Sequence, residues 1–553
     1  MASADRARRD RIPALALTAL LATWSIVLYR FAELRHDRFG TFGFDLGIYD
    51  QAGWLVAFNE PAFMTVRGLE VWGHHGTFVF YLLAPGYWLG GGAKWLLAAQ
   101  VAAQASGGLA LYLLVRDLLG RRFRWLGVGA AALLLLHPTS QWLVWEFFHP
   151  DSLAIGPLLL AWWAARTQRW VLFGVFALVA ASCKEDVVLS IAMIGVIIAA
   201  SRPRTRDTLR IGVATALVSA GWYLLVTRWM IPAHNPFGAF YEQQFFSDFG
   251  QSTGQVVWNV VSDPLHTLWY IKSPDHLEWY RMMFLPVLLS CFLRPKVMLI
   301  AAPMIAVVLL TDEGHSFVRV SWYHYSAIPV AVTVLAVVEC VVWVGTRVEG
   351  RTDWRRWSPH ALLAVMVVMG LVATRLWGVF PGSERAAIGA GFWPRWPGES
   401  ALDVVVGVDA RRDPRAAAKA DAVEMVPAGA RVSAAYNVTP HLAHRRFVYQ
   451  YPNPWLAENW GVQDENQHDP GSIDWLLVDR QLLERGSPAA QVVDHLLANE
   501  FDVVFEREDV VLARRSGPPA CIADPAGVVR GDANADFYVT SAPPSTGMVC
   551  PVT

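Results

Sequence analysis

The sequence predicts an α-helical polytopic membrane domain of about eleven or twelve transmembrane helices (residues 1–380), a small α/β domain (381–515) and a poorly ordered tail (516–553). Three observations lead to this prediction. Hydrophobic residues make up 54% of the 553 positions and charged residues only 17%, so apolar surface exceeds what one soluble core buries. Apolar runs of about 20 residues recur as far as Phe380. Loops rich in Lys and Arg recur between the apolar runs, at positions that can all lie on the same side of a membrane.

The apolar runs place the predicted spans along the chain. The first follows the basic segment MASADRARRDR, which carries no small-residue cleavage site, so we expect a retained helix that starts in the cytoplasm. The expected spans cover residues 12–33, 95–116, 124–140, 152–166, 170–183, 187–201, 209–231, 280–293, 296–311, 326–346 and 359–380. Residues 77–92 are left open as a further span or a re-entrant segment.

Charge sets the expected orientation in the plasma membrane. Lys- and Arg-rich loops share the cytoplasmic side if they are residues 116–124, 165–169, 201–210, 294–296 and 346–356. Ionisable residues of the remaining loops then gather on the outer side. Polar groups at membrane depth cost several kcal/mol unless they are paired or hydrated, so we expect one outward-facing cavity. The α/β domain follows the last span on that outer side and is expected to be extracytoplasmic.

The predicted α/β domain combines two helices with strands. A helix over 411–425 leads into the strand RVSAAY, and IDWLLVD reads as a buried strand. A helix over 488–499 precedes FDVVFEREDVVLARR, which alternates as a hairpin. An extracytoplasmic tail would allow Cys521 and Cys550 to form a disulfide.

The stretch FGFDLGIYDQAGW, residues 42–54, places two carboxylates just after the first span. Apolar spacing from Leu46 to Phe58 predicts a short amphipathic helix at the membrane interface, with Asp45 at or near its N-cap. Asp45 therefore either only caps this helix or also belongs to a functional site. Asp50 either bonds a ligand hydroxyl or faces water.

Several motifs together resemble the DUF2079 family of bacterial polytopic membrane proteins across residues 12–515. They are FDLGIYDQ, HH-x-x-F-x-x-Y-L-L-A-P, EFFHPD, SCKEDVVL, HYSAIPVA, VPAGARVSAAYNVTPHLAHRRFVYQYP and WLLVD. That family looks related to the GT-C superfamily of glycosyltransferases, which use lipid-phosphate-linked sugars. The resemblance implies a GT-C-like membrane domain and an acid just after the first helix that acts as base or positions the acceptor. By position this acid is Asp45, which lacks the adjacent second acid of the commonest GT-C signature.

The expected function is transfer of a sugar from a polyprenyl-phosphate donor to a glycan, lipid or protein acceptor of the cell envelope, on the outer membrane face. This chemistry needs a base for the acceptor hydroxyl and cations for the departing phosphate. We expect Asp45 to be the base and Lys184 to meet the phosphate, with His74, His75 or Arg281 beside it. The expected substrate-binding residues are Asp50, His74, His75, Glu146, His149, Asp151, Lys184, Glu185 and His324. No cofactor is assigned, and a divalent cation on His74, Glu146, His149 and Asp151 is left open.

Each candidate has a structural alternative. Glu146 or Asp151 can support a helix that starts at Pro150, and Lys184 can form a local charge cluster with its acidic neighbours. Histidines 74 and 75 can simply pack. In the α/β domain, an acceptor site or a satisfied loop would explain Asn437, His441, Arg445 and Arg446.

Two other functions stay open for the whole chain: a transporter or flippase with an outward-facing polar pathway, and a noncatalytic envelope-assembly protein. A formal net charge of −1 argues against nucleic acid as a partner. The sequence has no Walker loop, GxSxG or CxxCH motif, and no convincing GxGxxG after a strand. An ATP-driven pump, a serine hydrolase, a cytochrome c and a dinucleotide enzyme therefore lack support.

Overall fold

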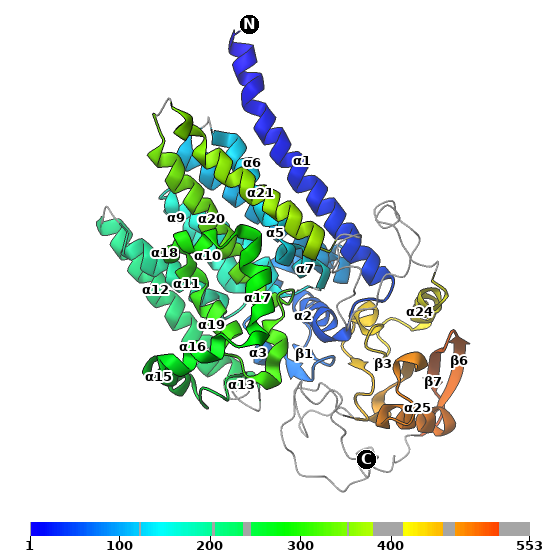
Figure 1. Cartoon of the computed structure of the whole chain (residues 1–553). Helices are drawn as coiled ribbons and strands as arrows, with labels where there is room; N and C mark the ends of the chain where they lie inside the picture. The colour runs from blue at the N-terminus through cyan, green and yellow to red at the C-terminus, as the bar shows by residue number, and fades with distance from the viewer. Residues whose placement is uncertain are drawn as a thin grey trace.

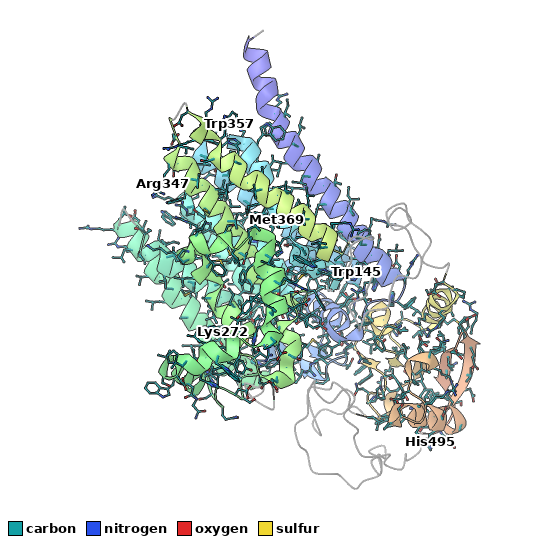
Figure 2. All side chains as sticks on the ribbon, viewed as in Figure 1. Trp145, Lys272, Arg347, Trp357, Met369 and His495 are labelled. Carbon is teal, nitrogen blue, oxygen red and sulfur yellow. The ribbon has the colours of Figure 1, made fainter. Side chains whose placement is uncertain are left out.

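The computed structural model describes residues 2–120, 123–146, 148–201, 205–235, 245–350, 353–379, 413–456 and 470–518. A bundle of helices forms the larger part, and the first helix projects from one end of it (Figure 1). The α/β domain lies at the opposite end. Figure 2 shows Arg347 and Trp357 toward the N-terminal end of the bundle, whereas Lys272 and His495 lie toward the other end. The predicted order, a helical domain followed by a small α/β domain, is confirmed.

Five of the described helices are long and apolar enough to cross a membrane. They are α1 (Ala2–Asp37), α5 (Ala93–Leu119), α12 (Arg206–Leu225) with its continuation through α13 (Ile231–His234), α20 (Ala327–Arg347) and α21 (Ser358–Trp377). Helix α20 is buried on every side from Ala327 to Val342 and lies at the centre of the bundle. A helix that is apolar all round favours such a central place.

Shorter helices fill the space around these five. They are α6 (Arg124–Leu136), α7 (Pro138–Glu146), α8 (Pro150–Leu153), α9 (Ile155–Arg166), α10 (Trp170–Cys183), α11 (Val187–Ala199), α15 (Thr253–Ser262), α16 (Pro264–Ile271), α18 (Pro295–Met298) and α19 (Ala302–Leu310). Most predicted spans thus coincide with helices, and α10 has the predicted bounds. Several are shorter than the run of about 20 residues that a straight crossing needs.

Two segments differ from the expected spans. The expected span over 280–293 is not one regular helix: α17 (Pro274–Phe284) ends there, and short 3₁₀ turns follow. Pro286 cannot continue a regular helix, and Leu288 and Leu289 adopt left-handed backbone at φ +48° and +57°. Segment 77–92 forms only α4 (Val79–Trp88), about 15 Å long. It is shorter than the run of about 20 residues that a straight crossing needs, whereas α5 is long enough to cross.

The segment that follows α1 departs from the expected interfacial helix. A π-helical turn over Gly43–Gly47 precedes α2 (Ile48–Ala57), and Gly47 occupies the N-cap, so Asp45 does not cap the helix. Most of α2 is buried, and Gly53 packs against the ring and hydroxyl of Tyr87 in α4. The helix is therefore covered by protein on its polar and its apolar sides. A short hairpin, β1 (Phe63–Met64) and β2 (Leu69–Glu70), and α3 (Val71–His74) complete the segment.

The α/β domain holds a five-stranded mixed sheet in the order β4-β3-β5-β7-β6. Its strands are β3 (Val432–Ala434), β4 (Val448–Gln450), β5 (Trp475–Asp479), β6 (Phe501–Arg507) and β7 (Val510–Arg515). Strand β3 pairs in parallel with β4 and β5, whereas β7 is antiparallel to β5 and β6. Helices α24 (Pro414–Met425) and α25 (Pro488–Asn499) match the predicted helices. The start of the domain at 381 and the predicted Cys521–Cys550 pair lie outside the described residues.

Candidate functional site

Charged and aromatic side chains meet at the end of the bundle that faces the α/β domain. They come from four places: the turn before α2, the start of α8, the tight turn between α10 and α11, and the segment that leads into α20. Each place is a helix end, where chain direction changes and polar groups of the backbone are available. Segments far apart in sequence thus contribute to one site.

Asp45 lies in the turn before α2 with backbone angles of φ +64° and ψ −89°. A non-glycine residue rarely adopts positive φ, and such positions cluster at functional sites. The side chain is partly exposed. Removal from water raises the pKa of Asp45 to about 7, Lys184 and Arg67 lower it, and Asp151 raises it further. The carboxyl group is therefore poised to exchange a proton near neutral pH.

Lys184 is the buried cation of the turn between α10 and α11. Its Nζ lies 3.4 Å from Asp151 Oδ2 and 3.3 Å from Asp186 Oδ2, and 5.8 Å from the centre of the Tyr325 ring. The ammonium group acts electrostatically on Asp45. Lys184, the predicted phosphate contact, is therefore close enough to influence Asp45, the predicted catalytic residue.

Arg67, which the sequence analysis missed, is the second cation beside Asp45. It is buried in the β1–β2 turn, and its guanidinium carbon lies 5.7 Å from the centre of the Phe44 ring. The signal in the sequence is that Arg67 is the only Lys or Arg between Arg38 and Lys94.

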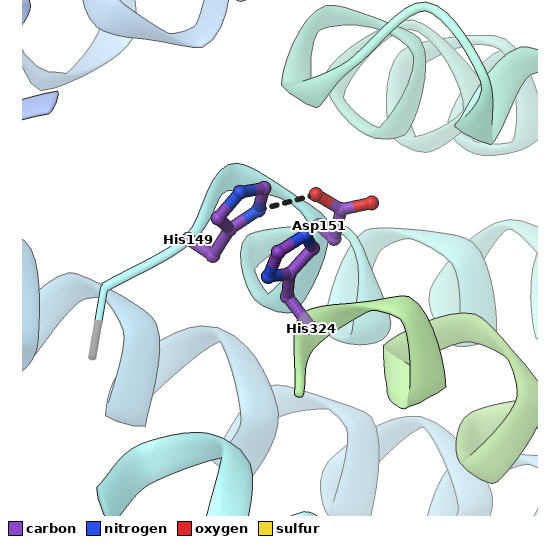
Figure 3. Close-up of side chains that lie close together, drawn as sticks. All are labelled: His149, Asp151 and His324. Atoms are coloured by element: carbon purple, nitrogen blue, oxygen red, sulfur yellow. Dashed lines mark ion pairs between the residues drawn. The ribbon is translucent and has the colours of Figure 1, made fainter. Parts of the chain in front are cut away.

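Three predicted binding residues form a compact cluster next to Lys184. Figure 3 shows the imidazoles of His149 and His324 beside the carboxylate of Asp151. The two rings stack with centroids 3.3 Å apart, and His149 Nδ1 lies 2.5 Å from Asp151 Oδ2. One ligand atom from each of the three residues lies within 4.8 Å of the others. These residues could hold a metal ion.

Two further predicted binding residues, His75 and Glu185, contact each other and hold two segments of the chain together. His75 Nδ1 lies 2.8 Å from Glu185 Oε1, and Glu185 Oε2 accepts the Gly76 N–H at 2.9 Å. This contact joins the segment between α1 and α4 to the turn that carries Lys184. The ring of His74 lies beside those of Tyr49 and His75, with centroids 6.0 and 4.3 Å away.

Asp50 faces the α/β domain. Its Oδ1 accepts the Tyr87 hydroxyl at 3.0 Å and pairs with His444 Nε2 at 3.2 Å. Burial lowers the pKa of His444, but its ion pair with Asp50 raises the value above the ordinary one overall. The carboxylate is buried in this interdomain contact, so the alternative that Asp50 faces water is wrong.

Gln51, one residue further on, strengthens the same interdomain contact. Its Nε2 donates to Thr65 Oγ1 at 2.9 Å and to the Arg445 carbonyl at 3.1 Å, and its Oε1 accepts the Val66 N–H at 3.0 Å. Thr65 in turn bonds both the N–H and the carbonyl of Val448 in β4. The α/β domain thus holds the loop that carries Asp45.

The remaining predicted residues lie apart from this cluster. Glu146 ends α7, and its side chain lies outside the described residues. Arg281 is exposed and pairs with Glu278 at 3.3 Å. The loop residues of the α/β domain lie against other protein groups: Arg445 donates to backbone carbonyls, Arg446 pairs with Glu60, His441 stacks on His36, and Asn437 is buried.

The chain is similar to several solved structures. ArnT from Cupriavidus metallidurans bound to undecaprenyl phosphate is 13% identical, with a TM-score of 0.48 over 90% of this chain and 97% of that chain. The apo oligosaccharyltransferase of Archaeoglobus fulgidus is 14% identical, with a TM-score of 0.36 over 84% of this chain and 70% of that chain. AglB from the same organism, in complex with an inhibitory peptide and a dolichol-phosphate, is 12% identical, with a TM-score of 0.36 and the same coverage.

No functionally curated protein matches the chain. A family model matches residues 35–512, which include both the helical bundle and the sheet of the α/β domain. The description of that family is "Predicted membrane protein (DUF2079)", and the chain belongs to it.

Proposed function

We propose that this membrane protein is a glycosyltransferase that moves a sugar from a polyprenyl-phosphate donor to a hydroxyl of a cell-envelope acceptor. The observation that carries the proposal is the placement of a partly exposed carboxyl group, Asp45, beside two buried cations, Lys184 and Arg67. The sequence resemblance to GT-C glycosyltransferases supports the donor class.

Asp45 has the properties of a general base. Catalysis by a base is most effective when its pKa lies near the working pH, and burial raises the pKa of Asp45 to about 7. Asp45 lies on a π-helical turn before α2, and its carboxylate does not cap that helix. Asp45 would take the proton of the acceptor hydroxyl as that oxygen attacks the anomeric carbon of the sugar.

Lys184 and Arg67 suit the leaving group of the same reaction. As the acceptor oxygen bonds to the anomeric carbon, the bond from that carbon to the phosphate oxygen breaks, and the phosphate carries away the electron pair. Fixed cations stabilise this developing charge most strongly where water is excluded, and both side chains are buried. Arg67 adds planar hydrogen-bonding geometry that matches phosphate oxygens.

The α/β domain has a supporting part in this proposal. It contacts the Asp45 loop through Gln51 and Asp50, and a Cβ added to Gly43 would lie 2.6 Å from Gln450 Oε1. Such close packing restricts the loop on both sides. Holding a base in one position lowers the activation free energy, because small displacements of the base slow proton transfer.

Reconstitution tests the proposal. The purified protein is placed in liposomes with radiolabelled polyprenyl-phosphate sugars and a membrane extract as acceptor, and label in the acceptor fraction is measured. We expect label to move from lipid to acceptor with the wild type and with Asp421→Asn, a surface carboxylate that pairs with Arg507. Movement of intact donor across the liposome, without transfer to any acceptor, would refute the proposal and favour a flippase.

A further inference from the structure

We infer that His149, Asp151 and His324 form a binding site for one divalent transition-metal ion, beside Lys184. Binding is measured without any sugar donor, so this inference stands or falls separately from the proposed transferase activity.

The first argument is the convergence of ligand atoms. His149 and Asp151 come from the start of α8, whereas His324 comes from the segment before α20, so the fold brings together residues that are distant in sequence. One ligand atom of each residue lies within 4.8 Å of the other two. The parallel rings direct their edges to the same side as the carboxylate (Figure 3).

The second argument is that these atoms lack hydrogen bonds. His149 Nδ1, Asp151 Oδ2 and His324 Nδ1 have no hydrogen-bond partner among the described residues, although His149 and Asp151 are more than nine-tenths buried. His149 Nδ1 and Asp151 Oδ2 lie 2.5 Å apart without the geometry of a hydrogen bond. Buried polar atoms without hydrogen bonds are costly, and a bound cation removes that cost.

The third argument is the support behind the ligands. The other ring nitrogen of His149, Nε2, lies 2.9 Å from the Tyr49 hydroxyl. The backbone N–H of His149 donates to Gln100 Oε1 at 2.9 Å. Metal-ligating histidines ordinarily use the second ring nitrogen in this way, which fixes the orientation of the ring. His149 is therefore held with Nδ1 toward Asp151.

The fourth argument is the arrangement of charged groups. The Lys184 ammonium is shared between Asp151 and Asp186, at 3.4 and 3.3 Å, so Asp151 does not have this cation to itself. A divalent ion between His149, Asp151 and His324 would give the Asp151 carboxylate a second cationic partner. Two imidazoles and one carboxylate suit zinc and similar first-row ions better than magnesium or calcium.

The test measures binding of Zn²⁺ alone to the chelator-treated, detergent-purified full chain by calorimetry and by metal analysis after desalting. The wild type should bind one equivalent. His324→Phe keeps a flat ring against His149 but removes the ligand nitrogen, so it should bind at least about tenfold more weakly while its thermal unfolding without metal stays unchanged. Asp151→Asn should weaken binding similarly.

His495→Ala is the matched control, because this histidine lies on α25 of the α/β domain and is not one of the three proposed ligands (Figure 2). It should bind like the wild type. Absence of stoichiometric Zn²⁺ on the wild type, or equal binding by the wild type and His324→Phe, would overturn the inference.

Discussion

Gln51→Leu should loosen the contact between the α/β domain and the loop that carries Asp45. Gln51 is fully buried, and its amide bonds the Arg445 carbonyl and the Val66 N–H. Leucine keeps the volume but leaves both backbone groups without this partner. Each unsatisfied buried group costs about 1–3 kcal/mol, so the two together destabilise the contact by about 2–6 kcal/mol.

Hydrogen exchange of the purified protein, followed by mass spectrometry, measures this loss of stability directly. The relevant amides are those of Gly43, which donates to the Tyr436 carbonyl, and Val448, which donates to Thr65 Oγ1. A loss of about 2 kcal/mol corresponds to about 30-fold faster exchange through local opening. The matched control is Gln491→Leu, because the Gln491 side chain is exposed on α25. This substitution should change the free energy of unfolding by less than about 0.5 kcal/mol. Wild-type exchange at both amides in Gln51→Leu would refute the reasoning.

Three further predictions concern the charged residues. A base with a pKa of about 7 is one-eleventh ionised at pH 6 and ten-elevenths at pH 8, so wild-type transfer should rise about tenfold between these pH values, whereas any residual transfer by Asp45→Asn should not follow this curve. Lys184→Met should raise the KM for the donor more than the KM for the acceptor, and equal changes in steady-state assays would contradict a phosphate contact. Because the folded-state pKa of His444 is raised, its ion pair with Asp50 stabilises docking below the ordinary pKa and is lost as pH rises through the raised one. The protection factors of residues 42–51, which are corrected for the intrinsic rise of amide exchange with pH, should therefore fall between pH 6 and pH 9, and His444→Gln should remove that fall.

Much of the fold is predictable because hydrophobic patterning follows local geometry. The run at 170–183 is bounded by Arg169 and Lys184, and the helix has those bounds. The run over 280–293 is apolar enough for a span, but its helix is interrupted because Pro286 lacks an N–H and has a fixed φ. Strand β4 was missed because three residues, Val448–Gln450, are too few to show an alternating pattern.

The candidate site was predicted in part. His149, Asp151 and His324 were all expected to bind substrate, and their ligand atoms lie close together, whereas the cation set left open from the sequence held His74 and Glu146 in place of His324. The partners of Asp50 could not be predicted in this way, because Tyr87 and His444 reach it only through tertiary packing and docking of the α/β domain. Helix α2 resembles an interfacial helix in its periodicity, but the same periodicity also suits a helix covered by a second domain.

Transfer and donor binding measured side by side on the wild type and Asp45→Asn test the central claim most directly. Asparagine keeps the size of the side chain and removes the base. The proposal predicts that Asp45→Asn binds polyprenyl-phosphate sugar with an affinity within about twofold of the wild type, since Lys184 and Arg67 remain, while transfer falls by at least about 100-fold. Transfer at the wild-type rate by a folded Asp45→Asn protein would contradict the claim that Asp45 activates the acceptor hydroxyl.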